Sequence, residues 1–304
     1  MKTNKILIGA GGGAKGYMQI HTLKKLEYEA HKPLCEDYDL LAGTSVGAIN
    51  MGIVASGQVT MDKFLRLYPS MCKEIFKKRF FGLIPRYSKK PFYRIFNDLI
   101  GSEFRLGDCK TKLMITSVDL VKDQNKFFKS WHEDDANEKL VDILCRSFAA
   151  PYYFGQINDK KHQCVWSDGG IGSSNFPLDE VKLQAEAMKM YYNVPLLIDA
   201  LGTGFIINNN TYKKVSRGNV LKQIGDFVKL KDGGMARSQS REDQIKRMVY
   251  IAKKVSNIRF RYWDIDINKK IDGLDKIKYL KEYGEYGIMI AQKPLIDIGG
   301  YNGK

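Results

Sequence analysis

A Gly-x-Ser-x-Gly pentapeptide at residues 43–47 constrains this 304-residue chain more than any other feature. An apolar run at residues 40–42 precedes it, and a helix-forming stretch follows. A strand, a sharp turn and a helix in this order lift a nucleophilic serine clear of a sheet. Gly43 and Gly47 leave the room that such a turn needs, so Ser45 is the candidate nucleophile. Because the pentapeptide also recurs by chance, other motifs have to show whether Ser45 is catalytic.

A glycine-rich loop, Gly11-Gly12-Gly13-Ala14-Lys15-Gly16, lies between an expected strand at residues 5–10 and a helix that starts at residue 17. Its spacing satisfies a dinucleotide fingerprint, which also needs an acidic residue at the end of the second strand. The acidic residues at 36, 37 and 39 lie ahead of that strand, which disfavours a dinucleotide. The alternative is an anion cradle, in which the free N–H groups of Gly11, Gly12 and Gly13 stabilise an oxyanion.

An Asp-Gly-Gly motif, Asp168-Gly169-Gly170, follows a short expected strand at residues 165–167. Aspartates beside glycines most often form turns. The positions of the histidines favour a catalytic role for Asp168 instead. A Ser–Asp–His triad in this chain order would place its histidine late in the chain. The chain holds only four, and none follows residue 162: His21, His31, His132 and His162. A carboxylate can serve as the base instead, which makes Asp168 the expected partner of the serine. An aspartate is a weak base at its ordinary pKa of about 3.9, so we expect a partly dry site that raises the pKa.

The motifs at 11–16, 43–47 and 168–170, in this order, resemble the patatin-like phospholipase family. Three flanking stretches also fit the family's pattern, at 149–154, 175–177 and 201–204, so the resemblance covers about residues 3–205. It implies hydrolysis of lipid acyl esters, of the phospholipase A or lysophospholipase type, through an acyl-serine and without a metal or cofactor. Carried over by position, Ser45 is the nucleophile and Asp168 the base. Gly12 and Gly13, with neighbouring amides, are the oxyanion donors.

Two positions depart from the family's commonest pattern. Lys15 stands where the loop usually has arginine, which keeps the charge but loses the planar fork. Ala10 stands where an aspartate often precedes the glycines. Neither residue takes part in the bond chemistry, so they bear on substrate preference and loop rigidity. The other motif residues expected to support the site match the pattern: Gly16, Gly43, Gly47, Gly169 and Gly170.

Net charge points to the partners. The chain has 49 Lys+Arg against 34 Asp+Glu, a balance of +15. Such a balance favours nucleic acid or an acidic membrane surface, although a lysine-rich proteome would also produce it. No nucleic-acid motif is present, so we expect a phospholipid or other acyl ester as substrate and peripheral contact with an anionic membrane. A small-molecule or protein activator is a further expected partner, since some members of the family are gated effectors.

Location is expected to be cytoplasmic, with peripheral membrane contact. Five widely spaced cysteines without a Cys-x-x-Cys pair suit a reducing compartment. The apolar run after the first lysines is too short for a signal peptide. The uncharged window 40–61 is about as long as a membrane span, but it is broken by four glycines and polar residues, so we expect no transmembrane helix.

Alternating strands and helices from residue 5 to about 205 predict an α/β fold: three α/β/α layers around a mainly parallel sheet, patatin-like. Residues 1–210 are the expected catalytic core. Residues 211–304 are the expected C-terminal α+β extension of the same domain, packed on it and the place for a regulatory surface. Within the extension we expect helices at 220–229, 243–255 and 277–283, a mobile loop at 231–240 and a strand at 258–263.

Residues 60–94 leave two structures open. A helical face runs from 60 to 78, and Pro69 is expected to bend or split it. Basic residues alternate with aromatics from 73 to 94. This segment is either an interfacial lid or a solvated connection whose aromatics fold back on the core.

Two other functions compete with the lipid hydrolase. One is a soluble carboxylesterase or thioesterase whose charge is incidental. The other, from a different class, is a nucleotide- or nucleic-acid-binding module on a hydrolase-like scaffold, since fold does not determine function.

Overall fold

The computed structural model describes residues 3–79, 85–172, 174–206 and 234–299. In these residues, nine strands form one sheet in the order β5-β6-β3-β2-β1-β7-β8-β9, and β4 pairs with β3 beside that path. The five central strands are parallel: β3 (Lys112–Asp119), β2 (Leu40–Thr44), β1 (Asn4–Gly9), β7 (Leu196–Leu201) and β8 (Ile258–Trp263). The other strands pair antiparallel toward the two edges: β4 (Gln124–Lys129), β5 (Ile157–Asp159), β6 (Cys164–Asp168) and β9 (Ile296–Ile298).

Alternate side chains of the central strands enter two separate apolar cores. On β1, Leu7 belongs to one core, and Ile6 and Ile8 belong to the other. All three side chains are fully buried, as expected for a parallel strand that is covered on both faces. The sequence therefore reads as a continuous apolar run rather than as an alternating one.

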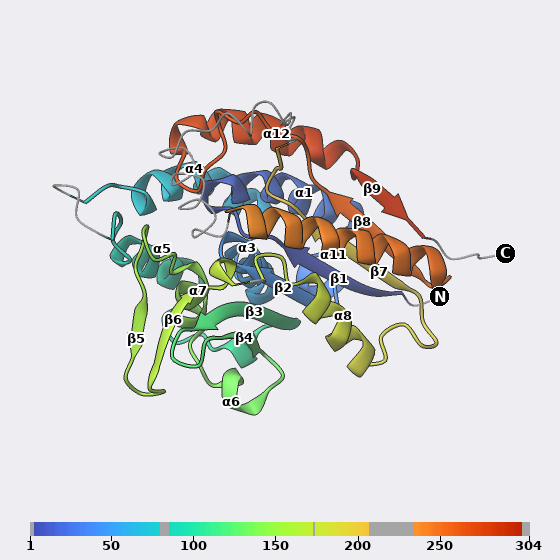
Figure 1. Cartoon of the computed structure of the whole chain (residues 1–304), viewed down its shortest axis with the longest axis horizontal. Helices are drawn as coiled ribbons and strands as arrows, with labels where there is room; N and C mark the ends of the chain where they lie inside the picture. Colours follow the sequence, from blue (N-terminus) through green and yellow to red (C-terminus); the bar gives the residue numbers. More distant parts are fainter. Residues whose placement is uncertain (1–2, 80–84, 173, 207–233, 300–304) are drawn as a thin grey trace, which may run out of the picture.

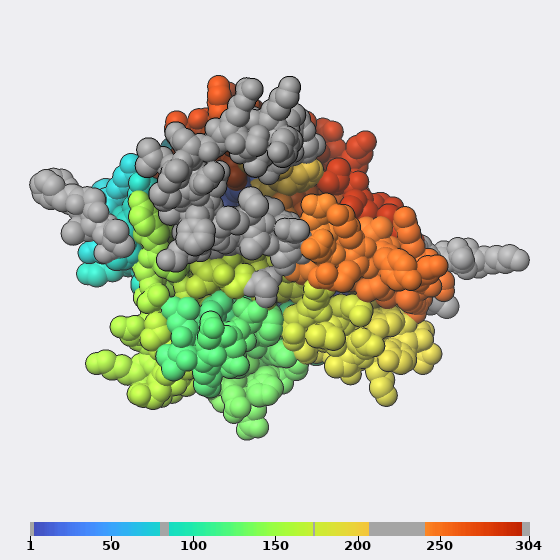
Figure 2. Space-filling model, viewed as in Figure 1, coloured from blue at the N-terminus to red at the C-terminus, as the bar shows by residue number. Residues whose placement is uncertain are grey.

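Helices cover both faces of the sheet (Figure 1). The first core is filled by α1 (Gly16–Ala30), α3 (Val46–Ser56), α4 (Met61–Ile75), α5 (Lys90–Ile100), α7 (Leu140–Phe148) and α12 (Leu280–Gln292). The second is filled by α8 (Leu178–Ala187) and α11 (Gly234–Lys254). The surfaces of α8 and α11 lie side by side in Figure 2. Arg247 of α11 pairs with Asp179 of α8. The predicted three-layer α/β/α fold is confirmed, and short helices α2 (Leu34–Asp37) and α6 (Glu133–Ala136) complete it.

The C-terminal residues lengthen the sheet itself. Strand β8 matches the predicted strand and pairs in parallel with β7, so that Leu196 lies opposite Ile258. Strand β9, which was not predicted, pairs with β8. The boundary at 210 and the helix expected at 220–229 lie outside the described residues. The loop predicted at 231–240 is wrong from residue 234 onward, because α11 already begins at Gly234. The last helix is longer than expected, since α12 continues to Gln292.

The region after the elbow also differs from expectation in one respect. Helix α4 is unbroken at Pro69, because its apolar face, with Phe64, Tyr68 and Met71, is held against the core. In the basic and aromatic segment, Phe76, Tyr87 and Phe92 are all buried. For the residues that are described, the aromatics therefore fold back on the core rather than forming an exposed lid; residues 80–84 lie outside them.

Within the described ranges, no helix is both long and apolar enough to cross a bilayer. The uncharged window 40–61 forms β2, the turn at Ser45 and α3. The five cysteines are free thiols.

Candidate active site

Ser45 occupies a strained turn at the carboxyl end of β2. Its backbone has φ 55° and ψ −123°, a conformation that residues other than glycine rarely adopt. Helix α3 begins at the next residue. The turn lies tightly against β1: a β-carbon on Gly47 would come within 2.1 Å of the Gly9 carbonyl oxygen. A β-carbon on Gly43 would come within 2.5 Å of the Gly47 backbone. The two glycines of the pentapeptide are therefore required by close backbone approach.

The hydroxyl of Ser45 donates a hydrogen bond to Asp168 Oδ2 at 2.7 Å. These two residues are 123 positions apart in the chain. Strand β6 ends at Asp168 and pairs with β3, which brings the carboxylate beside the end of β2. Asp168 Oδ1 accepts from the Gly170 N–H at 2.6 Å, which orients the carboxylate. Ser45 and Asp168 are only 7% and 6% exposed, so the two side chains lie largely shielded from water.

Ser147 on α7 is a site residue that no sequence motif indicated. The Ser45 N–H donates to Ser147 Oγ at 2.9 Å, and the Ser147 hydroxyl donates to the Thr116 carbonyl oxygen at 2.6 Å. Ser147 is fully buried. It joins the strained turn to β3 and thereby holds the serine backbone in place.

We expect Ser147→Ala to lower the free energy of unfolding by about 1–3 kcal/mol, because it leaves a buried N–H and a buried carbonyl without a partner. If the turn relaxes, ester hydrolysis should also fall roughly tenfold. Urea denaturation followed by circular dichroism measures the first effect. Ser70→Ala is the control, since the Ser70 hydroxyl lies on the exposed side of α4. Equal stability of the two variants would contradict the role of Ser147.

The glycine loop lies against Ser45, but its amides are not equivalent. A β-carbon on Gly11 would lie 3.2 Å from the Ser45 β-carbon. The Gly11 N–H donates to the Asn175 carbonyl oxygen at 3.0 Å, so this amide is already occupied, and the oxyanion role expected of Gly11 stays a prediction that would require this bond to break. Among the described residues, the N–H groups of Gly12 and Gly13 have no hydrogen-bond partner. The candidate donors therefore narrow to these two.

The supporting motif residues pack closely around the loop. Lys15 is 7% exposed, and its Nζ pairs with Asp272 Oδ1 at 2.5 Å, a partner that the sequence did not indicate. A β-carbon on Gly16 would lie 2.2 Å from Val46 Cγ2, and one on Gly169 would lie 2.6 Å from the Thr116 carbonyl oxygen. These contacts hold the three motifs together at the carboxyl ends of neighbouring strands.

The four histidines lie elsewhere. His21 is on α1, where burial and the nearby Lys24 charge lower its pKa. His31 ends α1, and His132 is exposed. His162 lies between Glu138 and Asp159, with ring nitrogens 3.0 and 2.8 Å from their carboxylates. The hydroxyl of Ser45 thus has a carboxylate as its partner rather than a histidine.

A small cavity adjoins Ser45 and Asp168. It encloses about 10 Å³, room for about one water molecule. Its other walls are mainly apolar and aromatic: Gly13, Phe76, Phe148, Ala150, Tyr153, Phe154 and Leu274. An acyl chain would find apolar surface here, but the enclosed space is too small to hold one.

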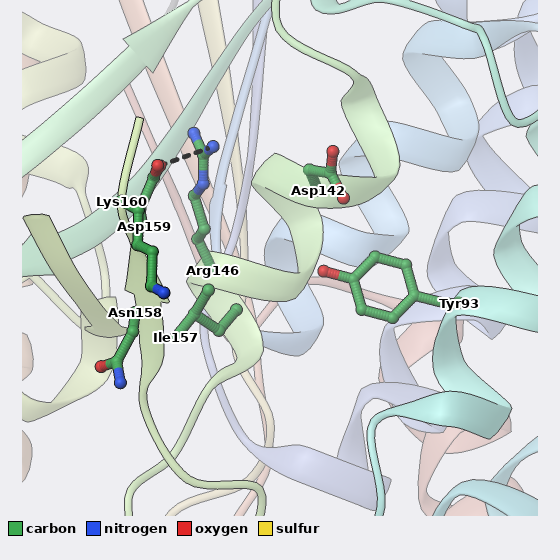
Figure 3. Close-up of a pocket in the computed structure, with 7 residues that line it drawn as sticks. All are labelled: Tyr93, Asp142, Arg146, Ile157, Asn158, Asp159 and Lys160. Carbon is green, nitrogen blue, oxygen red and sulfur yellow. Dashed lines mark ion pairs between the residues drawn. The ribbon is translucent and has the colours of Figure 1, made fainter. Parts of the chain in front are cut away.

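A larger hollow of about 250 Å³ lies between α5, α7 and the β5–β6 hairpin and includes neither Ser45 nor Asp168 (Figure 3). Arg146 pairs there with Asp159 and with Glu138, each at 3.0 Å. Burial alone would raise the pKa of Asp159, but hydrogen bonds from Trp166 and His162 and the charge of Arg146 outweigh this effect and lower the pKa to about 2. The Arg146–Asp159 pair fastens the hairpin that ends at Asp168 to the helix that carries Ser147.

Fold and site together define an α/β protein that carries a serine on a strand–turn–helix elbow beside a buried aspartate. A sequence model of patatin-like phospholipases matches residues 7–182, more than half of the chain, so the protein belongs to the patatin-like phospholipase family. The resemblance drawn from the three motifs is confirmed.

Two curated relatives and one solved structure illustrate the similarity. A cGAMP-activated phospholipase of Escherichia coli (strain TW11681) is 29% identical over 195 residues, which cover 56% of this chain and 53% of the relative. Calcium-independent phospholipase A2-gamma of Rattus norvegicus is 25% identical over 257 residues, which cover 73% and 32%. The crystal structure of VipD from Legionella pneumophila aligns with a TM-score of 0.44 at 12% identity, covering 96% of this chain and 67% of that one. The chain spans about half the length of the cGAMP-activated phospholipases that it matches.

Proposed function

We propose that this protein is a lipid acyl hydrolase of the phospholipase A or lysophospholipase type, with Ser45 as nucleophile and Asp168 as general base. The observation that carries the proposal is the 2.7 Å hydrogen bond between two buried side chains, Ser45 and Asp168, on a strained elbow beside a glycine loop. A nucleophile within hydrogen-bond reach of an oriented base is the arrangement that covalent catalysis requires. Here the Gly170 N–H orients the base.

The reaction follows from this geometry. Asp168 takes the proton of Ser45 as Oγ attacks the carbonyl carbon of the ester. The alcohol part of the lipid leaves with that proton, and an acyl-serine remains. Asp168 then accepts a proton from water, which attacks the acyl-serine, and returns that proton to Ser45 Oγ as the bond between the acyl carbon and Oγ breaks and the fatty acid leaves. One carboxylate serves both half-reactions.

The developing oxyanion would be stabilised by the N–H groups of Gly12 and Gly13. Fixed donors in a site that excludes water stabilise such charge without reorganising during the reaction. Gly12 also packs closely on Thr203, because a β-carbon at position 12 would lie 2.4 Å from Thr203 Oγ1. The loop is thus kept close to the serine by contacts that tolerate only glycine.

A lipid substrate is supported by membership of the family, by the apolar walls of the cavity and by the net charge of +15. We further propose that the protein works in the cytoplasm and binds anionic membranes peripherally, because a positive surface is attracted to acidic headgroups. A small-molecule or protein activator is part of this proposal, since cGAMP-activated phospholipases are among the relatives of this chain.

The soluble esterase or thioesterase stays as a second candidate, because the same dyad would cleave a short ester. The nucleotide-binding alternative has less support: the glycine loop is packed against Asn175, Thr203 and Leu274, which occupy the space beside its glycines.

The deciding experiment incubates wild type, Ser45→Ala and Ser70→Ala with vesicles of mixed phospholipids and identifies released products by mass spectrometry. We expect free fatty acid and lysophospholipid from wild type and Ser70→Ala, and neither from Ser45→Ala. A short soluble ester in parallel distinguishes the esterase, which would cleave the ester and leave the vesicles intact. Equal product from Ser45→Ala would refute the proposed nucleophile.

A further inference from the structure

A loop between β8 and α12 reaches back across the chain and covers the site. Leu274 lines the cavity together with Ser45 and Asp168. Its carbonyl oxygen accepts a hydrogen bond from the Ala14 N–H at 2.8 Å, so it occupies an amide next to the two candidate oxyanion donors. A β-carbon on Gly13 would lie only 2.2 Å from this same oxygen. The peptide carbonyl of Leu274 thus lies on the glycine loop, as a substrate's carbonyl would have to.

Two aspartates hold this loop in position, one on each side of Leu274. Asp272 pairs with the buried Lys15 of the glycine loop at 2.5 Å. Asp275 Oδ2 pairs with Arg86 at 2.8 Å and accepts from the Tyr87 hydroxyl at 2.6 Å. The first contact joins this loop to the glycine loop, and the second joins it to Tyr87, whose ring packs on Phe76 and Phe154 of the cavity wall.

Solvent reaches one partner of each of these two ion pairs, Asp272 and Arg86. The side chains of Asp272 and Arg86 are 42% and 37% exposed, whereas those of their partners Lys15 and Asp275 are only 9% and 15% exposed. By contrast, Phe148 packs on Phe154 with ring centroids 4.3 Å apart, and both rings are buried in the main core. Because solvent reaches one partner of each ion pair, salt and competing anions weaken both pairs, so the loop is the wall that opens at least cost.

We propose that residues 272–275 form an autoinhibitory strap, defined as the segment Asp272-Gly273-Leu274-Asp275, that must leave the glycine loop before an acyl ester can enter. The inference rests on the proposed hydrolase function. With the strap in place, the cavity has room for about one water molecule and the Ala14 N–H is taken. Releasing both carboxylates withdraws Leu274 and opens the space above Ser45. Anions that compete for Lys15 and Arg86 shift the strap toward release.

The test compares the double variant Asp272→Asn/Asp275→Asn with wild type and with Asp134→Asn/Asp243→Asn. The control removes two negative charges at exposed positions outside the strap. Hydrogen exchange by mass spectrometry, which needs no catalysis, should show faster exchange of the glycine-loop peptide, residues 10–16, only in the strap variant. A fluorophosphonate probe should label Ser45 roughly tenfold faster in the strap variant, a change of about 1.4 kcal/mol. Added salt should speed labelling of wild type more than of the strap variant.

The outcomes separate the two proposals. Unchanged exchange of the loop peptide, or equal labelling rates in the strap and control variants, overturns the strap while leaving the hydrolase intact. Faster exchange without labelling of Ser45 in any of the three proteins overturns the hydrolase function and the strap's inhibitory role with it. Faster exchange together with faster labelling is the expected result.

Discussion

Asp168→Asn is expected to lower ester hydrolysis by roughly a thousandfold while the protein stays folded. The amide keeps the shape of the carboxylate and can still accept the Gly170 N–H, but it cannot take the Ser45 proton. Loss of a general base costs about 10²- to 10⁴-fold. Product release from phospholipid vesicles measures the effect, and thermal unfolding by circular dichroism checks the fold.

Asp119→Asn is the matched control for this experiment. Asp119 is also buried and lies at the end of β3, the strand that pairs with β6, but its carboxylate caps the turn at Val121 instead of facing the serine. It should keep most of its activity. If a folded Asp168→Asn protein hydrolysed the lipid at the wild-type rate, the proposed Ser45–Asp168 dyad would be refuted.

Gly47→Ala should have the largest effect on stability, lowering the free energy of unfolding by at least about 2 kcal/mol and abolishing activity. The added β-carbon would be 2.1 Å from the Gly9 carbonyl oxygen, and this neighbour is strand backbone that has no side-chain freedom to move away. Relief requires α3 to move off β1, which displaces Ser45 from Asp168. Denaturant titration of purified protein gives the unfolding free energy.

Gly284→Ala on α12 provides the comparison. Its new β-carbon would lie 3.2 Å from the edge of the Tyr17 ring and 3.8 Å from His21 Nε2, both of them side-chain atoms. Alanine is favoured over glycine inside a helix by up to about 1 kcal/mol. It should therefore be near neutral. If Gly47→Ala were as stable as Gly284→Ala, close backbone approach at the elbow would not be the reason for the pentapeptide's glycines.

Much of the fold could be predicted because its signals are local. Continuous apolar runs such as residues 6–8 predict strands that are buried on both faces, and glycines at the ends of strands predict tight turns. The elbow strand, the helix after it and β8 were predicted nearly to the residue. The short edge strands β5 and β9 were missed, since three residues carry too little pattern to stand out.

The sequence by itself determined which residues form the candidate site: the serine on its elbow, the aspartate before two glycines, and the glycine loop. Small residues at a turn and a shortage of histidines are visible without coordinates. Only the tertiary structure decided how they meet. Ser147 supports the serine backbone, Asn175 takes the Gly11 amide, and Leu274 lies on the loop, each from a distant part of the chain. These contacts depend on sheet register and on loop packing between segments more than 100 residues apart, for which a single sequence carries no local signal.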